Sequence, residues 1–194
     1  MLFLARCPGC GAVHGGWCDG CWTVLVNAPV EHRSGVLVSH EYAGALRELI
    51  VAMKYTSARW VAPMLGELWV ERHAQVWDLQ AVTWVPTTRT RMRERGYDQS
   101  ELIARRIARR LGVPCTRLLR RIDDTAQTGR TASERRNGAR FIARRSRYTR
   151  VLLVDDVVTT GATLEHGLDA LRSVGVRMVT CAAIAATKAP EGRR

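Results

Sequence analysis

Residues 151–163 read Val151-Leu152-Leu153-Val154-Asp155-Asp156-Val157-Val158-Thr159-Thr160-Gly161-Ala162-Thr163. The run opens with four leucines and valines and no polar interruption, which is typical of a strand buried on both faces of a parallel sheet. Two adjacent carboxylates follow, and then a turn rich in threonine. We expect the acidic pair to emerge at the carboxyl edge of the sheet, where ligands of open α/β sheets bind.

The acidic pair and the turn favour a particular kind of ligand. Asp155 and Asp156 need hydroxyl donors or a cation, because burying them without partners is costly. The turn from Thr159 to Thr163 offers hydroxyls, a glycine that permits tight geometry and the free amides of a helix start, which together favour a phosphate. This combination predicts a ribose 5-phosphate site. The alternatives are a buried strand with a plain polar turn, and a signalling receiver domain, which carries adjacent acids at an early strand without such a turn.

Strand-like and helical patterns alternate along the rest of the chain. The patterns predict strands at 36–42, 81–85, 151–154 and 178–184, and helices at 43–55, 63–76, 98–111 and 162–174. Asp98 and Glu101 match a reciprocal cap at the start of the third of these helices, in which Asp98 accepts a free amide of the first turn. Residues 87–96 are predicted as loop, and 122–139 as a mobile, arginine-rich segment. The order predicts an α/β fold, with a mainly parallel twisted sheet flanked by helices on both faces.

The composition fits a globular protein with a buried core, since 46% of the residues are hydrophobic and 25% are charged. No apolar run approaches the roughly 18 residues that span a bilayer. Residues 1–5 are too short for the apolar core of a signal peptide. We therefore expect a cytoplasmic protein.

The net charge of +12 is concentrated in one segment, because residues 89–150 hold 19 arginines against six acidic residues. The planar guanidinium matches pairs of phosphate oxygens, so the segment indicates a polyanionic partner, which includes nucleic acid. A solvated surface is the alternative interpretation.

Residues 1–30 are predicted to form a separate module, and residues 31–194 the main domain. The module holds two CxxC pairs seven residues apart, formed by Cys7, Cys10, Cys18 and Cys21. Two such pairs can surround one tetrahedral ion, so the sequence predicts a structural zinc site. An iron–sulfur cluster and a ligand role for His14 remain alternatives. Cys115 and Cys181 are expected in the core.

Several further segments point to a known family. They are the CxxC pairs, Tyr42-Ala43-Gly44, Leu49-Ile50 with Lys54-Tyr55, Val85-Pro86, Arg93-Glu94-Arg95-Gly96-Tyr97-Asp98-Gln99, and Gln127 with Glu134-Arg135-Arg136-Asn137. With these segments the chain resembles the ComF family, a competence-linked branch of the type I phosphoribosyltransferases, whose diphosphoribosyl-binding motif resembles residues 151–163. Two positions depart from the pattern. Trp84-Val85-Pro86-Thr87 stands where Pro-Val-Pro is usual, and Asp98 stands where asparagine is usual.

The resemblance implies a role for each matching segment. Asp155 and Asp156 bind the ribose hydroxyls, directly or through Mg²⁺, and the turn wraps the 5-phosphate through Thr159, Thr160, Gly161, Ala162 and Thr163. The loop Thr87-Thr88-Arg89 holds pyrophosphate. Arginines that offset the charge of the leaving pyrophosphate are candidates as well. They are Arg93, Arg95, Arg130, Arg135 and Arg136.

Three functions fit these features. The first is binding of phosphoribosyl diphosphate with Mg²⁺, with transfer of the phosphoribosyl group to an acceptor that the sequence does not identify, in nucleotide metabolism or DNA uptake. The second is a non-catalytic competence factor that handles single-stranded DNA, or works with a DNA-processing protein, through the zinc module and the arginine-rich face. Trp17 and Trp22 would then stack on bases or else pack the module. The third is a regulatory sensor of the same ligand.

Overall fold

The computed structural model describes residues 6–7, 9–13, 17–28, 32–33, 35–56, 58–73, 78–122 and 139–188. Its helices are α1 (Asp19–Asn27), α2 (Gly44–Tyr55), α3 (Val61–His73), α4 (Arg89–Arg95), α5 (Gln99–Leu111) and α6 (Ala162–Ser173). Its strands are β1 (His32–Arg33), β2 (Val36–Glu41), β3 (Ala81–Trp84), β4 (Leu119–Ile122), β5 (Arg140–Ala143), β6 (Arg150–Val158) and β7 (Met178–Ala186).

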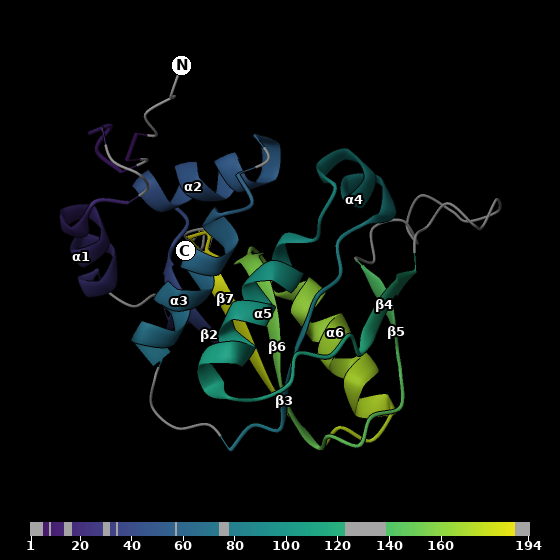
Figure 1. Cartoon of the computed structure of the whole chain (residues 1–194). Helices are drawn as coiled ribbons and strands as arrows, with labels where there is room; N and C mark the ends of the chain where they lie inside the picture. The colour runs from purple at the N-terminus through teal and green to yellow at the C-terminus, as the bar shows by residue number, and fades with distance from the viewer. Residues whose placement is uncertain are drawn as a thin grey trace, which may run out of the picture.

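The main sheet has the strand order β1-β2-β7-β6-β3 (Figure 1). The short edge strand β1 is antiparallel to β2, and the other neighbours are parallel. β6 lies inside the sheet, with β7 on one side and β3 on the other. β4 and β5 form a separate antiparallel hairpin. The predicted α/β class, a mainly parallel sheet flanked by helices, is confirmed.

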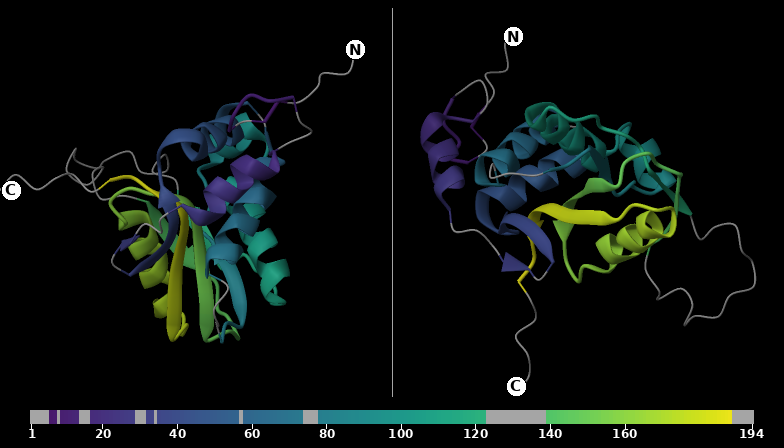
Figure 2. Two further views of the ribbon diagram at one scale, coloured as in Figure 1. Left: turned by 90° about the vertical axis from the view of Figure 1, so that its left-hand side faces the viewer. Right: turned by 90° about the horizontal axis from the view of Figure 1, so that it is seen from below.

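Successive residues of β6 serve two different cores, as the alternation of side chains along a strand requires. Leu152 and Val154 belong to the cluster that includes α2, α3 and α5. Val151 and Leu153 belong to the cluster that includes α6 and the β4–β5 hairpin. Figure 2 shows the sheet between these two layers. The continuous apolar run in β6 follows from burial on both faces.

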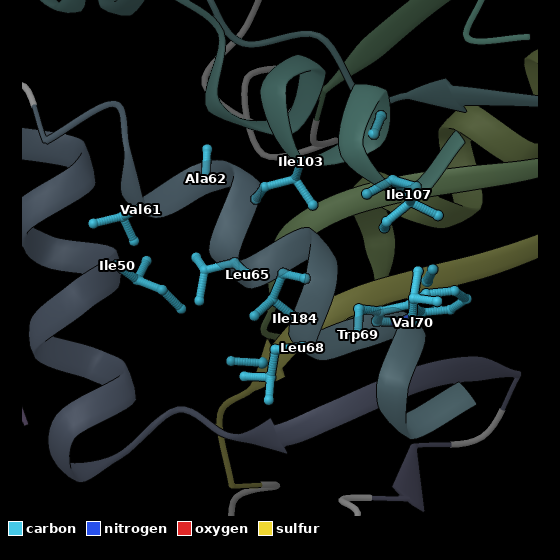
Figure 3. Close-up of a cluster of buried hydrophobic side chains, with 14 of the residues drawn as sticks. Ile50, Val61, Ala62, Leu65, Leu68, Trp69, Val70, Ile103, Ile107 and Ile184 are labelled. Atoms are coloured by element: carbon cyan, nitrogen blue, oxygen red, sulfur yellow. The ribbon is translucent and has the colours of Figure 1, made fainter. Parts of the chain in front are cut away.

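The larger core joins elements that are distant in sequence. Ile50 of α2, Leu65 and Leu68 of α3, Ile103 of α5 and Ile184 of β7 point toward one another in Figure 3. All five are almost fully buried. Close packing here holds α3 and α5 over one face of the sheet and α2 against α3, and both α2 and α5 bring residues to the carboxyl edge of the sheet.

Two of the predicted boundaries were wrong. β6 continues to Val158 instead of ending at residue 154, because Asp155 and Val157 keep pairing with β7. Residues 87–96 were predicted as loop, but α4 occupies most of this segment. No α4 side chain is buried, so the helix has no apolar periodicity that would reveal it.

Other elements went unpredicted or lie partly outside the described residues. α1 and the β4–β5 hairpin were not predicted. The second helix was expected to hold Pro63 in its first turn and does so, because it begins at Val61. It is described up to His73, and the expected end near residue 76 lies outside the described residues. Most of the segment 122–139 lies outside the described residues.

Candidate functional site

A cleft of about 320 Å³ opens at the carboxyl edge of the sheet. The acidic pair of β6 lies in its wall, together with residues from α2, α4, α5, β4 and the turn before α6. Of the predicted site residues, Asp155, Asp156, Thr159, Thr163 and Thr87 line it. The structure therefore brings the loop after β3 next to the acidic pair and the threonine turn, which lie together much later in the sequence.

Asp155 takes two hydrogen bonds on the same oxygen. Its Oδ1 accepts from the hydroxyl of Ser100 at 3.2 Å and from the amide of Asp156 at 2.8 Å. Ser100 belongs to the first turn of α5, so this bond connects the acidic pair to that helix.

The pKa of Asp155 is raised well above its ordinary value. The main cause is desolvation, because the surrounding protein removes most of the water from the carboxyl group even though part of the residue faces the cleft. The negative charge of Asp156 adds to the rise. The free protein therefore holds this carboxylate at a cost, and a bound cation or hydroxyl donor would reduce that cost.

Asp156 has both carboxylate oxygens engaged. Its Oδ1 accepts from the amide of Val157 at 2.8 Å. Its Oδ2 forms an ion pair with the Nζ of Lys54 at 2.8 Å, but the contact does not have the geometry of a hydrogen bond. Lys54 reaches the cleft from the last turn of α2. The side chains are 18% and 8% exposed for Lys54 and Asp156 respectively, so water screens this ion pair only weakly.

The threonine turn leads into the first turn of α6. Gly161 precedes the helix with φ of 92°, a conformation that glycine adopts without strain. The hydroxyl oxygen of Thr160 accepts from the amide of Ala162 at 3.4 Å. Thr159 and Thr163 face the cleft on either side of this bend. Hydroxyls and helix-start amides at this position suit an anion.

Asp98 connects the loop after β3 to α5, and its predicted capping role is confirmed. One carboxylate oxygen accepts from the amides of Ser100 and Glu101 at 3.1 and 3.4 Å, and the other accepts from the amide of Thr87 at 3.0 Å. Burial raises the pKa of Asp98. Asparagine has one carbonyl oxygen instead of two, so it would lose one side of this bridge. The carboxylate at this position thus fits its three amide donors.

The reciprocal half of the predicted cap has a different partner. The carboxylate of Glu101 pairs with Arg105, one turn further along α5, at 2.7 Å.

The remaining residues predicted to bind the pyrophosphate do not line the cleft, or lie outside the described residues. Thr88 caps α4 by accepting from the amide of Arg91 at 3.2 Å. Arg89 and Arg93 are exposed on α4 and are not among the residues that line the cleft. The guanidinium of Arg95 lies 5.6 Å from the ring centre of Tyr55. Arg130, Arg135 and Arg136 lie outside the described residues.

Several cleft residues were missed at the level of sequence. They are Tyr42, Lys54, Arg91, Gln99, Ser100 and Arg121. Gln99 is 5% exposed, and its Oε1 has no hydrogen-bond partner within the described part of the chain. A buried acceptor of this kind needs a donor, which a ligand hydroxyl or amine would provide. Gln99 follows the Asp98 cap directly and ends a segment that resembles the ComF family, and these were the signals available in the sequence.

The four amino-terminal cysteines come together as predicted. The Sγ atoms of Cys7, Cys10, Cys18 and Cys21 all lie within 4.8 Å of one another. Two of the pairs, Cys7–Cys18 and Cys10–Cys18, are 3.6 and 3.7 Å apart. Ligands of a tetrahedral zinc ion with bonds of about 2.3 Å would be about 3.8 Å apart. The cluster therefore fits a metal ion with four thiolate ligands.

The surroundings of the cluster support the same conclusion. The amide of Cys18 donates to the sulfur of Cys7 at 3.5 Å, and such amides lower the pKa of Cys7 to about 6. Hydrogen bonding to Cys18 raises the pKa of Cys21 to about 12. Four clustered thiols ionise together only beside a cation. A Cβ on Gly9 would lie 2.8 Å from the sulfur of Cys21, so only glycine fits there.

The cysteine-bearing segment packs on the main domain, because Cys7, Trp17 and Leu25 belong to the larger core. Hydrogen bonds also hold the end of α1. Arg72 of α3 donates to the carbonyl oxygens of Leu25 and Val26 at 3.0 and 2.6 Å, and also to that of Ala28. His40 contacts the same Leu25 oxygen at 2.7 Å, and burial lowers its pKa to about 4, so the ring is neutral and donates. A cation at a helix carboxyl end satisfies carbonyls that lack intrahelical partners.

In the part of the chain that is described, no helix is both long and apolar enough to cross a membrane.

Comparison with known proteins gives two sequence matches. The model of the phosphoribosyl transferase domain family matches residues 98–194. Competence protein F of Haemophilus influenzae is 30% identical over 187 residues, which cover 89% of this chain and 81% of that protein.

Solved structures give weaker matches. Adenine phosphoribosyltransferase from Leishmania tarentolae is 16% identical, with a TM-score of 0.49 and 82% of each chain covered. The enzyme from Leishmania donovani is 12% identical, with a TM-score of 0.48 and coverage of 86% of this chain and 93% of that one. Glutamine phosphoribosylpyrophosphate amidotransferase from B. subtilis is 21% identical, with a TM-score of 0.44. The match covers 66% of this chain and 26% of the amidotransferase, so the chain spans about a quarter of that protein.

Proposed function

Because the chain belongs to the ComF family of proteins with a phosphoribosyl transferase domain, we propose that its cleft binds phosphoribosyl diphosphate together with Mg²⁺. One observation carries the proposal. The acidic pair, the threonine turn and three basic side chains (Lys54, Arg91 and Arg121) line the same cleft. Carboxylates that bind a diol, a phosphate cup and cations for a diphosphate are the three parts that such a ligand requires.

Each part of the ligand has its own group of residues in this proposal. Asp155 and Asp156 bind the ribose hydroxyls, and the buried acceptor of Gln99 takes a further hydroxyl. The turn binds the 5-phosphate through Thr159, Thr160, Gly161, Ala162 and Thr163. The loop Thr87-Thr88-Arg89 and Arg91 hold the diphosphate. Arg93, Arg95, Arg135 and Arg136 remain candidates for contacts with its outer phosphate.

The donor set of the cleft suits magnesium. The carboxylates of Asp155 and Asp156 and the nearby hydroxyl of Thr159 are hard oxygen ligands, which Mg²⁺ prefers, and it usually binds proteins through one or two carboxylates plus substrate phosphates. When bound, the metal would offset the charge that develops on a leaving pyrophosphate. The chain would then transfer the phosphoribosyl group to an acceptor, in nucleotide metabolism or DNA uptake.

Zinc is the metal that we propose for the four cysteines, since a complete set of thiolates leaves no open position for chemistry. Its role would be structural.

Ligand binding is the first test. Phosphoribosyl diphosphate with Mg²⁺ should raise the melting temperature, because a ligand at about 100 times its Kd stabilises by about 2.7 kcal/mol. The Asp155→Asn, Asp156→Asn double variant should lose the shift. The exposed carboxylate of Asp169 on α6 offers a matched control, and Asp169→Asn should keep it. Absence of a shift with the intact protein would contradict the proposal.

A second measurement separates binding from turnover. Nucleobases and amines are offered as acceptors, and pyrophosphate release is followed. Release that depends on one acceptor supports transfer. Binding without release from any acceptor favours the sensor or the non-catalytic role.

A non-catalytic competence factor is the second candidate, and the arginine-rich surface favours it. Exposed arginines lie on α4 and around the β4–β5 hairpin. They are Arg89, Arg91, Arg93, Arg117, Arg120, Arg140, Arg144, Arg145 and Arg147. Such a surface suits the phosphates of single-stranded DNA. If Arg120→Ala with Arg140→Ala leaves both the affinity for an oligonucleotide and its salt dependence unchanged, this surface does not bind DNA.

A further inference from the structure

Lysine is rare in this chain, and one of its two copies lies in the cleft. The sequence holds only Lys54 and Lys188, against 28 arginines. Lys188 pairs with Glu41 at 3.3 Å near the surface, with its side chain 78% exposed. Lys54, in contrast, is mostly buried and lies 2.8 Å from the Oδ2 of Asp156. A chain that otherwise uses arginine for almost every cation has a lysine beside its acidic pair.

The two cations differ in a way that matters at this position. An arginine would bind a carboxylate through two parallel hydrogen bonds in a fixed plane. The ammonium of lysine is a compact charge on a flexible stem, so it can leave one anion and reach another. Asp156 is held in the free protein by a partner that can move away.

The surroundings of Lys54 limit where its ammonium can go. α2 is fixed in the core through Leu49, Ile50 and Met53, and the hydroxyl of Tyr97 donates to the Met53 carbonyl. The backbone that carries Lys54 is therefore held in place. The open direction is the cleft, which Lys54 lines together with Thr87 and Arg91.

We propose that Lys54 is the counter-cation of Asp156 in the free protein, and that it keeps this carboxylate from a metal ion until a diphosphate ligand attracts the ammonium away. The proposal rests on the proposed function of the same cleft, and it adds an order of events. Lys54 makes the binding of metal depend on the binding of the diphosphate. It also supplies one positive charge to the ligand when it moves.

Metal binding without any ligand tests this directly. Mn²⁺ serves as the probe, and free Mn²⁺ is followed by electron paramagnetic resonance at pH 8. The wild type should bind Mn²⁺ weakly alone and at least tenfold more tightly with phosphoribosyl diphosphate, after subtraction of the Mn²⁺ that the same concentration of the diphosphate binds in a sample without protein. Lys54→Met removes the counter-charge and should bind Mn²⁺ alone at least tenfold more tightly than the wild type. Lys188→Met, which removes the exposed lysine, should behave as the wild type.

Lys54→Arg keeps the ion pair and provides a second variant if Lys54→Met does not fold. A guanidinium that stays on Asp156 should weaken Mn²⁺ binding in the presence of phosphoribosyl diphosphate by at least tenfold. Equal affinity of wild type and Lys54→Met for Mn²⁺ alone would overturn the proposal, as would wild-type behaviour of Lys54→Arg. If phosphoribosyl diphosphate fails to bind while Lys54→Met gains Mn²⁺ affinity, the proposed function is wrong. Lys54 is then still the counter-cation that keeps Asp156 from the metal, but another anion must displace it.

Discussion

The cysteine cluster and the cleft assemble their ligands in opposite ways. The cluster takes four identical soft ligands from residues 7–21, a single short stretch of chain. The cleft takes carboxylates, hydroxyls, an amide and three cations from segments between Tyr42 and Thr187. The cluster therefore depends on spacing within one segment, whereas the cleft depends on how the helices pack over the sheet.

The two sites also differ in whether they need an external cation to balance their negative charge. The pKa of Cys7 is lowered and that of Cys21 is raised, so the four thiols do not all ionise at neutral pH unless a cation lies between them. The cleft has a cation of its own, because Lys54 already balances Asp156. We therefore expect the cysteine module to depend on its metal for folding, and the main domain to fold without any ligand.

Loss of one cysteine ligand should have the largest effect. Cys18→Ser removes the sulfur that lies 3.6 Å from that of Cys7 and 3.7 Å from that of Cys10. Structural zinc binds comparable peptides with about 10–16 kcal/mol, so most of the module's stability should disappear. Metal content should fall from one ion per chain to none, and amides of α1 should lose protection in hydrogen exchange.

The matched control is Cys115→Ser, which lies outside the cluster and should keep the metal. Amides of β6 and β7 should stay protected in both variants. If they exchange as fast as those of α1, the module and the main domain do not fold separately.

The contact between the two regions comes next in size. Arg72→Met removes the guanidinium that binds three carbonyl oxygens at the end of α1, among them those of Leu25 and Val26. Hydrogen bonds to a charged group contribute about 1.5–3 kcal/mol, so we expect a loss of about 2–3 kcal/mol. Calorimetry should show a separate early transition for the module. Arg47→Met, which removes a surface ion pair, should change stability by less than about 0.5 kcal/mol.

The features that could be predicted from the sequence are those that depend on residues close together in the chain. The apolar run of β6, the Asp98 cap and the two CxxC pairs each depend on residues that are neighbours in the chain. Their structures follow from periodicity, from a side chain that caps the next amides, and from ligand spacing. For this reason the sheet class, the capped start of α5 and the cysteine cluster were all found from sequence.

The missed features depend on tertiary contacts or lack a periodic pattern. α4 buries no side chain, so no apolar stripe marks it. Lys54 reaches Asp156 across 102 positions of the chain only because α2 packs into the larger core beside α3. Arg91 and Arg121 face the cleft while Arg93 is exposed on α4, and nothing in an arginine-rich segment separates them. Which arginine faces a ligand is a property of the fold.

A smaller effect is expected where the cleft meets α5. Asp98→Ala removes the helix cap and the bond to the Thr87 amide, and should cost about 1–2 kcal/mol in urea unfolding. Asp98→Asn keeps the cap and avoids the burial of a charge, which the raised pKa of Asp98 shows to be unfavourable. It should stay within about 1 kcal/mol of the wild type. A larger loss in Asp98→Asn than in Asp98→Ala would contradict this prediction and show that the Thr87 amide requires an acceptor oxygen that asparagine cannot offer in addition to the cap.

The smallest effect should be a gain in stability at the cleft itself. The raised pKa of Asp155 means that the folded state holds a proton on this group more tightly than the unfolded chain does. Its contribution to the free energy of unfolding therefore decreases as the pH rises from the ordinary value of about 3.9 through the folded pKa. Asp155→Asn removes the charge and can still accept from Ser100 and from the amide of Asp156.

We expect Asp155→Asn to stabilise the ligand-free protein by about 1 kcal/mol at neutral pH, a gain of about 2–4 °C in melting temperature. The two melting curves should converge as the pH falls toward 4, where the wild-type carboxyl group is protonated as well. The exposed Asp169→Asn on α6 should melt within about 1 °C of the wild type at neutral pH. A lower melting temperature for Asp155→Asn at pH 7 would mean that the ionised carboxylate stabilises the fold. The cleft would then resemble the cysteine module, in which the ligand groups themselves hold the structure together.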